Sequence, residues 1–224
     1  MLSVVIPTRQ AEEGLARTLA SLVSGAAEGV VREVVVVDDA STDGTSIVAD
    51  AAGCTLIDVP GGWVGRVAAG IATARRAPWY LILEPDVFLD GDWFREAAAF
   101  VDRIERLGRA DEAVACFRLA YDEFGWRARF AERLAAIAGG LLAPPLAAQG
   151  LLVARRHWDR LAAGLGPDAG HARLAARLGR SAVHVLRADA VVLPPRDVGT
   201  AVPGAAALIR HALAGLGLPI APTR

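Results

Sequence analysis

The sequence predicts an α/β fold built on a mostly parallel β-sheet that is flanked by helices. Within the first ninety residues, four short apolar runs alternate with three helical patterns. The runs are almost continuously apolar, which is typical of strands buried on both faces of a parallel sheet. Polar or acidic residues follow several of these runs, and ligands of such sheets bind outside the carboxyl ends of the strands. The pattern therefore indicates a Rossmann-like sheet, followed by a smaller mixed region.

The elements of the first half can be placed from apolar spacing and from turn residues. Pro7 is expected to stop the first strand, and Gly25 and Gly29 to end the first helix. A glycine-rich loop over residues 61–66 should precede the third helix. We expect strands at 2–6, 30–37, 54–59 and 79–83, and helices at 12–24, 45–52 and 67–76.

The second half is less regular, but it shows no repeat and no low-complexity tract. We expect strands at 113–121, 150–154, 183–186 and 190–193, and helices at 92–107, 127–142, 157–163, 168–178 and 202–214. The chain is expected to form one domain over 1–224, with a nucleotide-binding half at 1–90, an acceptor and catalytic half at 91–195 and a helical tail at 196–224.

Composition narrows the classes of partner. With 54% hydrophobic residues and a mean hydropathy of +0.36, the 224 residues can bury a large core. The net charge of -1 argues against a nucleic-acid partner, which needs a clustered basic surface.

No signal peptide is visible, and Cys54 and Cys116 lie in apolar stretches as expected of reduced thiols. The apolar stretch 134–154 is broken by glycines and prolines, so we expect a cytoplasmic protein with at most peripheral contact at the inner face of the membrane.

Two motifs stand about thirty residues apart. The segment Leu2-Ser3-Val4-Val5-Ile6-Pro7-Thr8, followed by residues 34–45 (VVVVDDASTDGT), resembles the opening of a family 2 glycosyltransferase with a GT-A fold. Gly65-Arg66 and Glu84-Pro85-Asp86 fall where that family has a Gly-Arg/Lys loop and an Asp-x-Asp triplet. Later segments around Phe117-Arg118-Leu119, Gln149-Gly150 and Arg177-Leu178-Gly179-Arg180 are similar to a small bacterial subgroup of the family.

The resemblance implies an enzyme of the hexosyltransferase type. Such an enzyme moves a sugar from a nucleotide-diphosphate donor, here a UDP- or GDP-sugar, to an acceptor hydroxyl with inversion. The acceptor is unknown and could be linked to a lipid. The resemblance spans about residues 2–195 and is clearest up to residue 90.

For the nucleotide, the resemblance implies a pocket at the strand ends. A carboxylate there can accept hydrogen bonds from a base N–H or a ribose hydroxyl. A guanidinium fork can meet the diphosphate. The ordinary alternatives are solvated turns and a loop cation. The residues implied are Pro7, Thr8, Glu12, Asp38, Asp39, Arg66 and Glu84.

For the diphosphate charge, the resemblance implies one divalent cation, Mg²⁺ or Mn²⁺, held by Asp86 and Glu84. Carboxylate oxygens suit both ions, and the cation would act as a Lewis acid for the leaving diphosphate. Glu84 is one methylene longer than the aspartate usual in the family, and Pro85 stiffens the turn. The alternative is an ordinary acidic turn at a strand end.

For catalysis, the resemblance places the general base at Asp168 and an acceptor or donor-sugar contact at Gln149. Asp168 is equally suited to cap the following helix. His171 and His184 are expected to be surface or packed residues.

A second hypothesis is a catalytically degenerate GT-A protein that binds a nucleotide or a partner without turnover. Four departures from the family pattern favour it, namely Ala68, Glu84, Ala148 and Pro167. A nucleotidyltransferase is a weaker alternative, because no glycine follows the first strand. The donor sugar, the base, the acceptor and the oligomeric state stay open at this stage.

Overall fold

The computed structural model describes residues 1–121, 147–166, 174, 177–178 and 183–192. Within them the chain forms one eight-stranded sheet with the order β3-β2-β1-β4-β7-β6-β8-β5. The strands are β1 (Leu2–Thr8), β2 (Val31–Asp38), β3 (Thr55–Asp58), β4 (Trp79–Ile82), β5 (Val87–Leu89), β6 (Val114–Tyr121), β7 (Leu151–Ala154) and β8 (Val183–Val192). The helices are α1 (Glu12–Ala27), α2 (Thr45–Ala51), α3 (Trp63–Thr73), α4 (Trp93–Arg106) and α6 (Arg155–Ala162), with a short 3-10 turn at Ala147–Gln149.

The predicted α/β class is confirmed. The four strands β3, β2, β1 and β4 are parallel neighbours, as expected from strands that alternate with helices. Beyond β4 the sheet is mixed, because β7 pairs antiparallel with both β4 and β6, whereas β6 and β8 are parallel. The first four strands therefore bring their carboxyl ends to one edge of the sheet.

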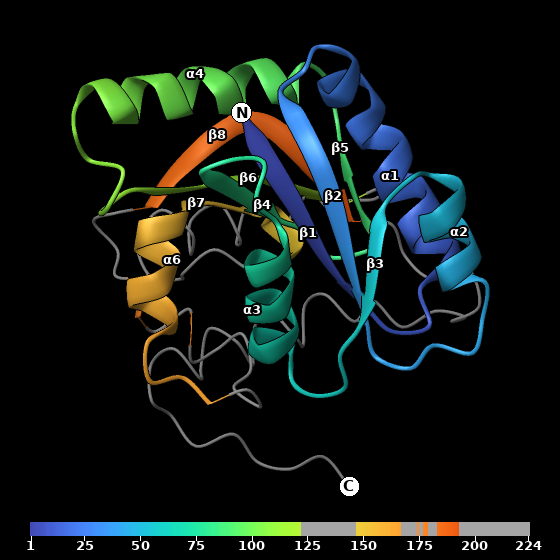
Figure 1. The fold of residues 1–224 in the computed structure, drawn as a ribbon. Coiled ribbons are helices and arrows are strands. Elements are labelled where there is room, and N and C mark those ends of the chain that lie inside the picture. Colours follow the sequence, from blue (N-terminus) through green and yellow to red (C-terminus); the bar gives the residue numbers. More distant parts are fainter. Residues whose placement is uncertain (122–146, 167–173, 175–176, 179–182, 193–224) are drawn as a thin grey trace, which may run out of the picture.

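Helices α1 and α4 cover one face of the sheet, and α3 and α6 cover the other (Figure 1). An apolar core lies between each pair of helices and the sheet. Because side chains alternate along a strand, Val4 and Ile6 of β1 face α1 and α4, whereas Val5 faces α3. Trp79 and Trp93 are among the largest fully buried side chains on the first face. On the other face α3 packs beside α6. Burial on both faces explains why β1 reads as a continuous apolar run.

Pro7 does not stop the first strand, as the sequence had led us to expect, since β1 continues to Thr8. The backbone of Val5 faces β4 and accepts a hydrogen bond from the N–H of Leu83. Pro7, two residues later, faces the same side, but β4 has already ended at Ile82. The N–H that proline lacks is therefore not needed at this position.

Three other expectations need correction. Helix α3 begins at Trp63, so only the glycines before it form the loop, and Arg66 lies in the first turn of the helix. The two late strands are one strand, β8, with a register shift opposite Cys116 and Arg118. Strand β5 was not predicted, since three residues are too short to show a pattern. The helices predicted at 127–142 and 202–214, and most of that at 168–178, lie outside the described residues.

A side chain of α4 binds the backbone at the register shift between β8 and β6. Both carboxylate oxygens of Glu96 in α4 accept backbone N–H bonds, from Arg187 at 2.7 Å and from Ala188 at 2.8 Å. These N–H groups lie in the stretch where β8 loses register with β6. A bulge that would otherwise leave donors unpaired is thus satisfied by a helix side chain.

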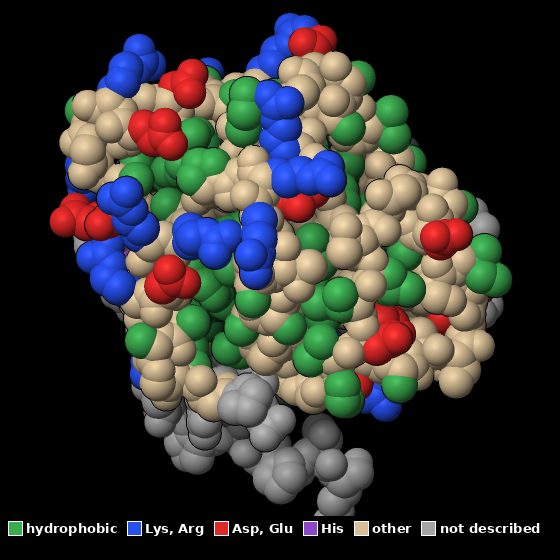
Figure 2. Space-filling model, in the orientation of Figure 1, with side chains coloured by type: hydrophobic (Ala, Val, Ile, Leu, Met, Phe, Trp, Pro, Cys, Tyr) green, Lys and Arg blue, Asp and Glu red, His purple; other side chains and the backbone are tan. Residues whose placement is uncertain are grey.

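Basic side chains gather over the amino ends of the central strands (Figure 2). Arg32 near the start of β2 and Arg75 and Arg76 before β4 are exposed there. They lie at the edge of the sheet opposite to the carboxyl ends of the parallel strands. Among the described helices, none is long and apolar enough to span a membrane.

The packing of α3 on the sheet gives the first prediction. A Cβ atom at Gly70 would lie 2.4 Å from Val5 Cγ1 and 2.9 Å from Val37 Cγ2. Since valine side chains are stiff, we expect Gly70→Ala to lower the free energy of unfolding by about 1–3 kcal/mol in urea denaturation. Gly166→Ala is the control, because a Cβ atom there meets nothing within 4 Å. Equal stability of the two variants would contradict this close packing.

Candidate active site at the carboxyl edge of the sheet

The turn after β2 is built around the buried carboxylate of Asp38. Its Oδ1 accepts hydrogen bonds from Thr8 Oγ1 at 2.8 Å and from Ser41 Oγ at 2.6 Å. Its Oδ2 accepts the backbone N–H of Ser41 at 2.7 Å. Asp38 thus joins the ends of β1 and β2 and holds the turn that follows. Of the two adjacent aspartates, Asp38 is therefore the one that stabilises the turn.

The segment after β1 is fastened to the same turn. The Gln10 side chain accepts the backbone N–H of Thr42 at 2.7 Å and donates to the Thr42 hydroxyl at 3.0 Å. Glu12 Oε2 accepts the backbone N–H of Gly44 at 2.9 Å. Gln10 and Ala40 have positive φ angles of 50° and 52°, which are uncommon for residues other than glycine. Glu12, predicted to contact the nucleotide, therefore has an observed contact within the protein.

Asp39 points to the first turn of α3 instead of the turn after β2. Its Oδ2 lies 3.1 Å from Arg66 Nη1 and 3.7 Å from Arg9 Nη1. Arg66 Nη1 also lies 3.4 Å from the carbonyl oxygen of Thr8. The side chains of Arg66 and Asp39 are only 14% and 17% exposed. Arg66 Nε is buried without a hydrogen-bond partner among the described residues, so the guanidinium keeps unused donor capacity.

Trp63 is a site residue that the sequence analysis missed. Its indole Nε1 donates a hydrogen bond of 2.6 Å to Glu84 Oε1. Trp63 is the first residue of α3, and the chain enters the helix through Gly61, with φ of 129°, and the N-cap residue Gly62. The tryptophan directly after two glycines was the available signal, but its partner becomes visible only once the helix start is known.

The acidic turn after β4 carries Glu84 and Asp86, the predicted cation ligands. Asp86 is exposed at the rim of the turn, but protein atoms packed around its carboxyl group, and next the negative charge of Glu84, raise its pKa. Helix α1 supports the turn from behind, because a Cβ atom at Gly14 would lie 2.5 Å from the carbonyl oxygen of Pro85.

The donor set of this turn suits a hard divalent cation. Two carboxylates that repel each other are stabilised by a cation between them, and the diphosphate and water would complete its coordination. Within the described residues, no group of three or more Asp, Glu, His or Cys side chains is placed to hold a metal ion by itself.

Of the remaining predicted residues, Gln149 stands just before β7, whose first residue Leu151 pairs with Ile82 at the end of β4. Gln149 Nε2 donates to the carbonyl oxygen of Phe117 at 3.1 Å, and Gly150 follows with φ of 66°. Asp168 and His171 lie outside the described residues. His184 is packed against Phe100, with ring centroids 5.4 Å apart.

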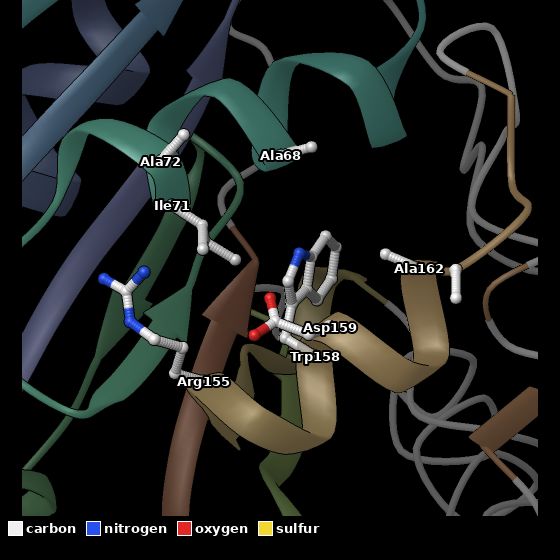
Figure 3. Close-up of a pocket in the computed structure, with 8 residues that line it drawn as sticks. Ala68, Ile71, Ala72, Arg155, Trp158, Asp159 and Ala162 are labelled. Atoms are coloured by element: carbon white, nitrogen blue, oxygen red, sulfur yellow. The ribbon is translucent and has the colours of Figure 1, made fainter.

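Two hollows lie away from the strand-end carboxylates. The larger, of about 390 Å³, lies between α3 and α6, where the Trp158 indole rises from α6 toward Ala68 and Ile71 (Figure 3). The second, of about 360 Å³, is lined by Asp111, His157, Arg160, Leu161 and Arg177. None of the predicted site residues that the structure describes lines either hollow. We place the candidate site at the carboxyl edge of the sheet because the ionisable groups converge there.

Comparisons with known proteins agree with the fold described above. The family model described as "Glycosyl transferase family 2" matches residues 3–133, more than half of the chain. No curated protein matches the chain significantly.

Solved structures match over most of the chain. Glucosyl-3-phosphoglycerate synthase from Mycobacterium tuberculosis, in complex with Mn²⁺, UDP and glucosyl-3-phosphoglycerate, is 19% identical with a TM-score of 0.59, over 99% of this chain and 81% of that one. The same synthase with Mg²⁺ and UDP is 18% identical with a TM-score of 0.58, over 99% and 81% of the two chains. S. aureus TarS 1-349 with UDP is 17% identical with a TM-score of 0.59, over 85% and 60%. These likenesses show the GT-A fold.

Asp38 gives the second prediction. Replacing Asp38 by alanine leaves Thr8 and Ser41 without their buried acceptor, so we expect Asp38→Ala to lower the free energy of unfolding by about 2–4 kcal/mol. Asp58→Ala, at the exposed end of β3, is the matched control and should change stability by less than about 0.5 kcal/mol. Chemical denaturation of both variants measures the difference, and a stable Asp38→Ala protein would disprove the anchoring role.

Asp86 gives the third prediction, on pH. Because its pKa is raised in the folded state, the ionised form is disfavoured there, and stability is lost as pH rises through that pKa. We therefore expect Asp86→Asn to raise the melting temperature at neutral pH in the absence of added metal ions, and to abolish any further rise that Mn²⁺ with UDP produces. Thermal melts between pH 4 and pH 8 test this. A lower melting temperature for the variant at neutral pH would show that the charge is not a burden.

Proposed function

The chain belongs to glycosyl transferase family 2 and is a glycosyltransferase, and we propose that it transfers a sugar from a UDP-sugar to an acceptor hydroxyl with the help of one divalent cation. The observation that carries the proposal is the convergence of Asp39, Arg66 and the Glu84–Asp86 turn at the carboxyl edge of a parallel sheet. These groups supply the two things that a nucleotide diphosphate needs, which are directional acceptors for its nucleoside and positive charge for its phosphates.

For the nucleoside, we propose that Asp39 and the backbone of Pro7 and Thr8 bind the base and the ribose. Asp39 supports this role because its neighbour Asp38 already holds the turn, which leaves Asp39 at the rim of the edge. UDP is favoured over GDP because the synthase and TarS structures contain UDP.

For the diphosphate, we propose that Arg66 and a cation held by Asp86 and Glu84 share the negative charge. Arg66 meets Asp39 and Thr8 through Nη1, so its other terminal nitrogen, Nη2, is the donor proposed to bind a phosphate oxygen. Mn²⁺ or Mg²⁺ accompanies UDP in structures of the synthase. When bound, the cation would supply Lewis-acid stabilisation of the leaving diphosphate.

For the acceptor, we propose that Asp168 removes the proton of the attacking hydroxyl and that the sugar is inverted by direct displacement. Gln149 would contact the acceptor or the donor sugar, and its tie to the Phe117 carbonyl sets its position. Glucosyl-3-phosphoglycerate synthase is also solved with phosphoglyceric acid. For this chain we propose an acceptor of unspecified class, and a lipid-linked one would be met at the inner face of the membrane.

A calorimetric titration with UDP plus Mn²⁺ tests the donor site, and UDP alone is the control for the cation. We expect binding that weakens strongly when Mn²⁺ is omitted. A folded protein that binds neither UDP nor GDP in the presence of Mn²⁺ would contradict the proposal.

Asp168 gives the fourth prediction. We expect Asp168→Asn to keep the affinity for UDP and Mn²⁺ but to lower the rate of transfer by roughly 10²-fold or more, since a general base contributes about that factor. Activity is followed as UDP release from a panel of UDP-hexoses, with Asp102→Asn on the exposed side of α4 as the control. Nucleotide binding without turnover, unchanged in Asp168→Asn, would favour the degenerate alternative.

A further inference from the structure

We propose that Trp63 is a positioning residue of the donor site, because its indole N–H holds the Glu84 carboxylate in the orientation that receives the cation and the diphosphate. The inference rests on the proposed function, since it concerns the same site. It adds a residue that lies neither in the glycine–arginine pair nor in the acidic triplet.

The geometry of the contact carries the inference. The bond between Trp63 Nε1 and Glu84 Oε1 is 2.6 Å long, and hydrogen bonds that a carboxylate accepts are shorter than those between neutral groups. Trp63 is only 8% exposed and belongs to the apolar core between α3 and the sheet, together with Val64 and Val67. Packing therefore fixes the indole N–H of Trp63, and the indole in turn holds the more flexible side chain of Glu84.

The chemistry of the two side chains explains what this contact does. An indole N–H can only donate, so Trp63 neither binds a cation nor carries a proton in the reaction. A carboxylate has about four acceptor sites, so the hydrogen bond from the indole does not by itself prevent Glu84 from meeting a cation. Glutamate has one more rotatable bond than aspartate, and each freely rotating bond must be ordered when a ligand binds. The hydrogen bond from Trp63 restricts rotation about the extra side-chain bond of Glu84 before any ligand binds.

The place of Trp63 in α3 extends the argument. Arg66 lies three residues later in the same first turn and contacts Asp39. One turn of helix thus orients a carboxylate after β4 and another after β2. The two carboxylates are the groups proposed for the cation and for the nucleoside, so a rigid helix start sets the distance between the two parts of the donor site.

The competing explanation is that Trp63 serves packing alone. Trp158 provides the matched control, because it is a buried tryptophan of the same core, 2% exposed, and projects from α6 into the hollow beside α3 (Figure 3). Replacement of either tryptophan by phenylalanine removes the indole N–H and keeps an aromatic ring in the core. Only the Trp63 change removes a bond to a strand-end carboxylate.

The experiment is a double-mutant cycle on the affinity for UDP in the presence of saturating Mn²⁺, measured by calorimetry. We expect Trp63→Phe to weaken binding by roughly tenfold or more, the usual effect of losing the partner of a metal ligand, while Trp158→Phe changes it less than about twofold. Glu84→Asp should also weaken binding, because the shorter side chain cannot reach both the indole and the cation. In the Trp63→Phe background, Glu84→Asp should add little further loss.

A second measurement uses the unaltered protein and does not depend on the folding of any variant. The indole N–H resonance of Trp63 in a ¹H–¹⁵N spectrum should shift when Mg²⁺ and UDP are added, because the cation draws charge from Glu84. The indole resonance of Trp158 should stay in place. A role in packing alone would move neither.

The outcomes separate the two proposals. If the wild-type protein binds UDP with Mn²⁺, but Trp63→Phe and Trp158→Phe bind equally well and the Trp63 resonance does not move, the positioning role is overturned and the proposed function stands. If the two tryptophan variants lose affinity equally, packing alone explains the loss and the positioning role is again overturned. If the folded wild-type protein binds no UDP with Mn²⁺, both proposals fall.

Discussion

The contact between Arg66 and Asp39 is the interaction on which the carboxyl edge of the sheet depends. It joins the first turn of α3 to the residue after β2, and the same guanidinium approaches the last carbonyl of β1. A mostly buried ion pair often contributes little net stability, because removing both charges from water costs about as much as their attraction returns. We infer that its main contribution is geometric, since three separate segments meet at one planar group.

In the acidic turn after β4, by contrast, the two carboxylates carry like charges that repel each other. Burial, and after it the negative charge of Glu84, raises the pKa of Asp86, so the ionised form of Asp86 is unfavourable in the folded protein. Helix α1 approaches the turn so closely at Gly14 that the turn has little room to relax. Groups held together against their repulsion are typical of sites that bind a cation, and they make a site less stable when it is empty. The tie from Trp63 to Glu84 fits this arrangement, because a carboxylate fixed in place cannot turn away from its neighbour.

The sequence predicted the features that depend on local patterns. Apolar runs and turn residues placed the parallel strands and the helices between them to within a few residues, and the resemblance of two short motifs pointed to the family. What depends on distant contacts could not be predicted. Asp38 binds Thr8, whereas Asp39 binds Arg66, because their side chains leave the end of β2 in different directions. The partner of Trp63 depends on where α3 begins, and the tolerance of Pro7 within β1 depends on where β4 ends.

The antiparallel pairing of β4 with β7 has a consequence for how the chain folds. Trp79 pairs with Ala154, so the inner edge of β4 receives its neighbour some seventy residues after β4 has been synthesised. Until then β4 presents unpaired backbone groups beside an apolar surface, which is the condition that promotes association between incompletely folded chains. Contacts over such a separation in sequence also slow folding, because a long loop must close before they form. A fragment that ends near residue 90 would keep this edge open, so the first ninety residues are a poor candidate for isolation as a stable piece.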